Sequence, residues 1–136
     1  MHKAFPASAE SVGEARHLVS AHLEHRGCCL ESIEQATLLT SEVASNAVLH
    51  ATTGGFTLDV DVSGDTVHVR VGDDDSRPPT RRRCGVGDES GRGLLLLDKL
   101  ADRWGVRIQL KGKAVWFELP CSLPRPRSGG PEAVAM

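Results

Sequence analysis

The sequence contains no tyrosine, three phenylalanines and two tryptophans, and it has no excess of positive charge. Its 16 lysines and arginines stand against 18 aspartates and glutamates, which gives a formal net charge of −2. A chain without an overall basic field is poorly suited to hold a nucleic-acid backbone. We therefore expect no direct nucleic-acid partner. With 136 residues, 40% of them hydrophobic, the composition is that of one ordinary soluble globular domain.

Long hydrophobic runs are also lacking. No run is longer than that from Leu94 to Leu97, which amounts to one helical turn, whereas a membrane-spanning helix needs ~20 apolar residues. The first six residues, Met1 to Pro6, have no apolar stretch of the kind found in secretory signals. We expect a cytoplasmic protein with no membrane contact.

Cysteine and histidine do not follow any common metal-binding spacing. The adjacent pair Cys28-Cys29 cannot form a two-residue-spaced clamp, and Cys84 and Cys121 lack a nearby ligand pair. Three further candidates on the first expected helix could form a weak surface metal site: His17, His22 and His25. A solvated polar face is the favoured interpretation, because no H-E-x-x-H pattern is present.

Hydrophobic periodicity predicts the order of the elements. Strands are expected at 2–5, 56–62, 67–71, 106–110 and 115–119, and helices at 8–27, 32–51 and 94–101. Ser8 is the expected N-cap of the first helix and Gly27 its end. The second and third strands should form a hairpin through a turn at 64–65, and a further turn is expected at 111–113. Val106, Ile108 and Leu110 are the expected apolar positions of the fourth strand. Periodicity is lost between 72 and 92, a length typical of a functional loop or lid. The predicted fold class is α+β, a two-layer sandwich whose mixed, mostly antiparallel sheet is covered on one face by helices. The domain is expected at 1–121, followed by a disordered tail at 122–136.

Three polar residues in the second expected helix, Glu42, Asn46 and His50, recur at every fourth position. Their side chains therefore line one stripe of the helix. A carboxylate can accept a proton from an attacking hydroxyl, and an amide oxygen can bind a hard cation such as Mg²⁺. The stripe is a candidate catalytic site. The solvent-facing side of an amphipathic helix is the alternative interpretation.

Asp73 directly follows an expected buried strand and opens the long loop. A carboxylate there can accept a hydrogen bond from an exocyclic amine such as that of adenine. A turn-forming acidic cluster with Asp74 and Asp75 is the alternative.

The sequence Gly91-Arg92-Gly93-Leu94 comes just before the third expected helix. Glycines at that place let backbone N–H groups approach an anion at the positive end of a helix. The sequence is neither a P-loop nor a dinucleotide-binding fingerprint, because neither pattern of glycines is complete.

The order of these motifs resembles the GHKL ATP-binding superfamily, which includes gyrase, histidine kinases and mismatch-repair ATPases. The motifs are SEVASNAVLH at 41–50, VGD at 71–73, GRGLLLLD at 91–98 and GKAVWFEL at 112–119. The resemblance covers roughly residues 8 to 120. It looks closest to the anti-sigma-factor serine kinases of Gram-positive bacteria, in particular the short actinobacterial members, and it implies the Bergerat ATP-binding fold.

The resemblance also implies roles, with ATP and Mg²⁺ as cofactors. Glu42 matches the catalytic base, Asn46 the residue that holds Mg²⁺ against the triphosphate, and Asp73 the carboxylate that binds the adenine amine. The other implied nucleotide contacts are Gly91, Arg92, Gly93, Leu94 and His50. A guanidinium such as that of Arg92 is suited to neutralise phosphate charge.

The loop departs from the superfamily at one position. The usual Asp-x-Gly is Asp73-Asp74-Asp75 here, and a side chain at Asp75 would crowd a nucleotide and add negative charge. The run from Arg81 to Arg83 could close over the phosphates as part of a lid, but a solvated loop is the favoured interpretation.

The resemblance implies an ATP-dependent protein serine kinase that sequesters a sigma factor and phosphorylates an antagonist protein on a serine. Family members often form homodimers. The alternative is a catalytically weak or inactive nucleotide-binding module that acts by docking on partners. A nucleotide hydrolase or a detached histidine-kinase domain is less favoured, because no phospho-acceptor histidine region is visible.

Overall fold

The computed structural model describes residues 1–50, 54–73, 89–110 and 112–122, and for 89–94 it describes the backbone alone. The strands are β1 (His2–Phe5), β2 (Phe56–Ser63), β3 (Thr66–Asp73), β4 (Arg103–Gln109) and β5 (Gly112–Pro120), and the helices are α1 (Ala9–His25), α2 (Leu30–His50) and α3 (Glu89–Leu100). The strands form one five-stranded sheet in the order β1-β2-β3-β5-β4. The predicted tail lies almost wholly outside the described residues.

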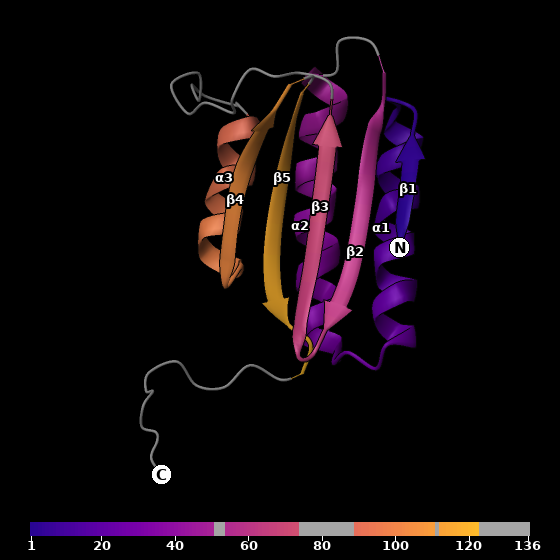
Figure 1. Ribbon diagram of the computed structural model, residues 1–136, viewed down its shortest axis with the longest axis vertical. Helices are drawn as coiled ribbons and strands as arrows, with labels where there is room; N and C mark the ends of the chain where they lie inside the picture. The colour runs from indigo at the N-terminus through magenta and orange to yellow at the C-terminus, as the bar shows by residue number, and fades with distance from the viewer. Residues whose placement is uncertain (51–53, 74–88, 111, 123–136) are drawn as a thin grey trace.

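The three helices cover one face of this sheet, and no helix among the described residues lies on the other face (Figure 1). The α+β sandwich predicted from the sequence is therefore confirmed. Every strand pair in the described part of the chain is antiparallel, so the sheet is not mixed. None of the described helices is long and apolar enough to cross a membrane.

Alternation along the strands decides which face is covered. Val67, Val69 and Val71 of β3 are buried together with Phe117 and Leu119 of β5, because side chains of a strand point alternately to the two faces. The apolar side chains of α1 and α2 pack against these strand residues, and Val19, Leu23 and Leu39 are fully buried. The central strands and α2 therefore form the core that positions the rest.

Local signals set several boundaries as expected. The Ser8 side chain caps α1 by accepting a hydrogen bond from the Ser11 amide at 3.2 Å, the role for which serine is favoured at this position. Gly27 follows the helix with φ 79°, and Gly64 begins the β2–β3 turn with φ 61°. Backbones with positive φ are cheap for glycine alone. The β2–β3 hairpin was correctly predicted.

Three expectations about local structure were wrong. First, α3 begins at Glu89, so Gly91 to Leu94 lie inside the helix and do not precede it; acidic Glu89 suits the positive end of a helix dipole. Second, Lys113 lies in β5 opposite Asp73, although a turn was expected there. Third, Ile108 is 53% and Leu110 97% exposed, because β4 is an edge strand that ends at Gln109.

One end of the molecule is closed by hydrogen bonds between segments that are distant in sequence. The Cys29 amide donates to the Cys121 carbonyl at 2.9 Å, and the Cys121 amide donates to the Asp65 carbonyl at 2.6 Å. The Ser32 hydroxyl donates to the Pro120 carbonyl at 2.6 Å. We call this the closed end; it comprises the α1–α2 connection, the β2–β3 turn and the end of β5 (Figure 1).

Candidate functional site

The candidate catalytic stripe lies along one margin of the buried face of α2. Leu39, Val43 and Ala47 of this helix are buried, and Glu42 and Asn46 beside them are half-buried. Successive helical residues are rotated by about 100°, so Ser41 falls on the opposite margin. There Arg16 of α1 donates to the Ser41 hydroxyl at 3.5 Å, which places α1 on that side.

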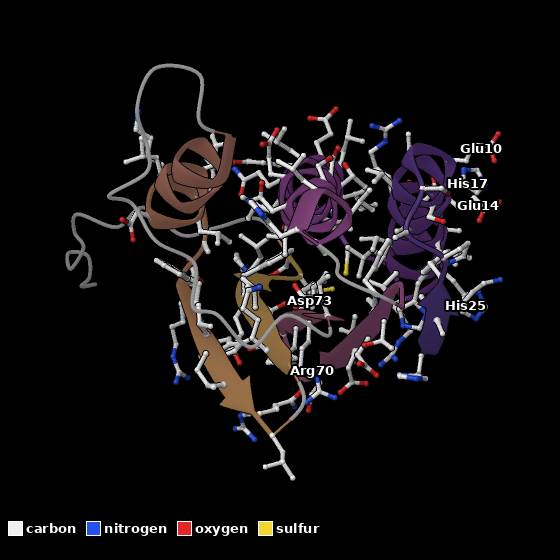
Figure 2. The ribbon with its side chains drawn as sticks, turned by 90° about the horizontal axis from the view of Figure 1, so that it is seen from above. Glu10, Glu14, His17, His25, Arg70 and Asp73 are labelled. Carbon is white, nitrogen blue, oxygen red and sulfur yellow. The ribbon has the colours of Figure 1, made fainter. Side chains whose placement is uncertain are left out.

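Glu42 and Asn46 therefore face away from α1, toward α3. Figure 2, seen from above, shows α2 between α1 and α3 over the same face of the sheet. His50 is the last residue of α2 and is exposed. The polar stripe is thus not the solvent-facing side of the helix over its whole length, because its first two members are half-buried on the side of α2 that faces α3.

Asp73 lies on the helix-covered face of the sheet, at the end of β3. Its strand partners are Phe56 on β2 and Lys113 on β5, and Figure 2 shows the side chain between the sheet and α2, with Arg70 on the opposite face. Lys113 Nζ lies 3.1 Å from Asp73 Oδ2 and 3.3 Å from Oδ1. The exposed fractions of the two side chains, Lys113 and Asp73, are 9% and 6%. The carboxylate is therefore held in a buried ion pair.

The start of α3 reaches the same end of the sheet as the end of β3, the start of β5 and the last turns of α2 (Figure 1). We call this the polar end, opposite the closed end. The first N–H groups of a helix have no partner within it, and here they include those of Glu89, Ser90 and Gly91. The amides of Gly93 and Leu94 lie deeper in the helix.

Several sequence-derived candidates lie outside the described residues: Asp74, Asp75 and the run from Arg81 to Arg83. The nucleotide contacts assigned to the described residues remain predictions. The arrangement nevertheless brings four separate segments to one end of the sheet: the end of α2, the end of β3, the start of α3 and the start of β5.

The chemistry available at the polar end suits a nucleotide. Glu42 and Asn46 supply a carboxylate and an amide oxygen on adjacent turns, and oxygen donors of this kind are those that Mg²⁺ prefers. Asp73 supplies a buried hydrogen-bond acceptor, and the N-terminus of α3 supplies donors and a positive dipole for an anion.

The other metal candidates are not brought together. Among the residues that the structure describes, no three His, Cys, Asp or Glu side chains group as a metal site. His17 and His25 lie on the exposed side of α1 (Figure 2). Burial raises the pKa of the Cys28 thiol to about 12, with a further contribution from its hydrogen bond with Cys121. Cys28 is therefore a protonated core residue at neutral pH.

Sequence reasoning missed Lys113, which was assigned to a turn. A signal was present: Val115, Phe117 and Leu119 are buried at alternate positions of β5, and the same alternation carried two residues back places Lys113 on the buried face. The lysine was overlooked because charged residues are almost never buried without a partner, and its partner is in a distant strand.

A five-stranded antiparallel sheet covered on one face by helices is the fold of the GHKL ATP-binding superfamily. The particular family follows from comparison with known sequences: the family model of the histidine kinase-like ATPase domain matches residues 5–119, so the chain belongs to that family. Membership of this family implies ATP binding.

Solved structures with a similar fold include the blue-light activated histidine kinase of Erythrobacter litoralis EL346. That protein matches with a TM-score of 0.55 and 21% identity over 77% of this chain and 40% of its own. Its separate histidine kinase domain matches with a TM-score of 0.55 and 21% identity over 86% of this chain and 62% of its own. These likenesses show the fold.

An uncharacterized protein of Streptomyces coelicolor is 52% identical over 55 residues, which are 38% of this chain and 52% of the relative. The matched region thus spans about half the length of that relative.

Proposed function

We propose that this domain binds ATP with Mg²⁺ and phosphorylates a serine of an antagonist protein, as part of a regulator that sequesters a sigma factor. The observation that supports the proposal is that the C-terminal half of α2, which holds Glu42 and Asn46, runs to the same end of the sheet as Asp73 and the start of α3. Family membership supports the nucleotide. The serine specificity and both partners rest on the resemblance described from the sequence.

Each residue has a defined task in this proposal. Asp73 accepts a hydrogen bond from the amine of the base, and the α3 N-terminus and Arg92 balance phosphate charge. Asn46 would hold Mg²⁺, which neutralises charge on the triphosphate when bound. Glu42, one turn away, orients the serine hydroxyl and accepts its proton as the oxygen attacks. Catalysis of this kind consists mainly of positioning.

A second candidate is a catalytically weak or inactive nucleotide-binding module that acts by docking on partners. The buried ion pair between Asp73 and Lys113 favours weak binding of the base, because part of the hydrogen-bonding capacity of the carboxylate is already used within the protein. Such a module would respond to nucleotide by changing its affinity for a partner.

The two candidates are separated by transfer of radiolabel from [γ-³²P]ATP to candidate antagonist proteins. Glu42→Gln is expected to lower the transfer rate about 100- to 10,000-fold, the usual range for a general base, with the Kd for MgATP changed less than about 3-fold. Glu34→Gln is the matched control, since Glu34 is an exposed glutamate of the same helix. MgATP binding without transfer to any candidate supports the module, and equal transfer by parent and Glu42→Gln contradicts the role of Glu42.

A further inference from the structure

Lys113 is a buried charged residue in a strand whose other inward-facing residues are apolar. Only 7% of its surface is exposed. Lysine is almost never buried unless it is paired. Here the pair is with Asp73, across the β3–β5 ladder.

Within the sheet, the neighbours of the pair on the helix-covered face are apolar. The row of strand partners from β1 to β4 reads Phe5, Phe56, Asp73, Lys113 and Ile108. Phe5 and Phe56 are buried and their rings stack at 5.1 Å. In this row the two opposite charges thus lie between aromatic and aliphatic residues at the polar end of the sheet.

Stability does not account for this arrangement. Moving each ion out of water costs several kcal/mol, and exchange of a buried ion pair for well-packed apolar residues is often neutral or stabilising by about 1–4 kcal/mol. A valine or leucine at 113 would continue the alternation of Val115 and Phe117. The charges therefore point to recognition of a polar partner at this place.

The pair presents an acceptor and a cationic donor side by side, with Nζ 3.1 Å from Oδ2. The edge of adenine carries the complementary pair: the exocyclic amine donates, and the adjacent ring nitrogen N1 accepts. An ammonium group can donate three hydrogen bonds, so one lysine can contact both the carboxylate and a base.

We propose that Lys113 is a specificity-determining residue that donates a hydrogen bond to N1 of the adenine whose amine is bound by Asp73. The inference rests on the proposed function, because it requires a nucleotide at the polar end. It assigns to Lys113 a direct contact with the base in addition to its contact with Asp73.

The test compares binding of MgATP and of Mg-1-deaza-ATP, in which N1 is replaced by C–H, by calorimetry. A hydrogen bond to a charged group contributes about 1.5–3 kcal/mol, so the parent protein is expected to prefer ATP by roughly 10- to 100-fold. In Lys113→Met the preference is expected to fall below about 3-fold. Arg107→Met is the matched control, because Arg107 is an exposed cation of β4 opposite Ala114, and it should keep the full preference.

The outcomes are distinct. Equal affinity of the parent protein for the two nucleotides overturns the inference and leaves the proposed function intact. A Lys113→Met protein that retains the full preference for ATP has the same consequence. No binding of MgATP by the folded parent protein overturns both. Should Lys113→Met fail to fold, Lys113→Gln, which keeps a polar side chain but is shorter and uncharged, takes its place: a preference below about 3-fold supports the contact, and a full preference overturns it.

Discussion

The two ends of the sheet use polar groups in opposite ways. At the closed end, the Cys29 and Cys121 amides and the Ser32 hydroxyl bind carbonyl groups of neighbouring segments. At the polar end, the polar groups include ionisable side chains on separate elements: Glu42 on α2, Asp73 on β3 and Lys113 on β5. Backbone pairing at one end joins the segments, whereas side-chain chemistry at the other can serve a ligand.

This difference predicts how substitutions should separate stability from binding. A buried hydrogen-bonding group contributes to folding mainly because leaving its partner unsatisfied is costly. A group that contacts a ligand contributes to affinity and leaves the free protein nearly unchanged. Substitutions at the closed end should therefore alter unfolding, and substitutions in the α2 stripe should alter nucleotide binding.

The largest effect is expected at the polar end. Asn46→Ala removes the amide oxygen proposed to hold Mg²⁺ and should lower the affinity for MgATP about 100-fold, or about 2.7 kcal/mol. The free energy of unfolding should change by less than about 0.5 kcal/mol, because Asn46 is half-buried at the margin of α2. Calorimetry with and without Mg²⁺ measures the effect. Gln35→Ala, on the same helix near the closed end, is the control, and unchanged MgATP affinity in Asn46→Ala would refute the assignment.

A smaller effect is expected for Ser32→Ala at the closed end. Ser32 is 1% exposed, its hydroxyl donates to the Pro120 carbonyl at 2.6 Å, and it accepts from Cys29 Sγ at 3.2 Å. Loss of the donor leaves the carbonyl unsatisfied, so urea unfolding should show a loss of about 1–3 kcal/mol.

The matched control for that change is Ser45→Ala, a half-buried serine of the same helix, which should cost less than about 0.5 kcal/mol. MgATP affinity should be unchanged in both variants. A lower affinity for MgATP in Ser32→Ala would mean that the two ends are coupled.

The smallest effect is expected from His22, in the last turn of α1. Burial lowers the pKa of this imidazole from its ordinary value of 6.5, and the N-terminal ammonium of Met1 and the Arg26 guanidinium lower it further, while Asp61 opposes them. Within the described residues, the buried Nε2 atom has no hydrogen-bond partner.

Because the unfolded chain then binds the proton more readily than the folded one, stability should fall slightly as the pH drops below 6.5. Urea unfolding at pH 7.5 and pH 5.5 measures this, and in His22→Gln the contribution of this site should disappear. An unchanged pH dependence in His22→Gln would show that other groups cause it.

The sequence predicted the fold well where one periodic pattern dominated. The alternation of Val67, Val69 and Val71 identified β3, and the four-residue spacing of Glu42 and Asn46 placed them on one stripe of α2. These features depend on local geometry alone. The α+β architecture was predicted from the order of the expected strands and helices.

Features that depend on distant partners could not be predicted in this way. Lys113 resembled a turn residue because it follows Gly112, whose φ is 139°, and its pairing with Asp73 links positions far apart in the chain. The start of α3 was misplaced because glycines at 91 and 93 usually interrupt helices. Tertiary packing of the leucines that follow stabilises the helix in spite of them.

The order of the strands has a consequence for synthesis of the protein. β5 is the last strand of the domain in chain order, yet it lies inside the sheet between β3 and β4. Until it emerges from the ribosome, the nascent chain exposes an open edge of β3, and β4 lacks its only neighbour in the described sheet. A chaperone that shields unpaired strands should bind this intermediate, and release should coincide with arrival of β5.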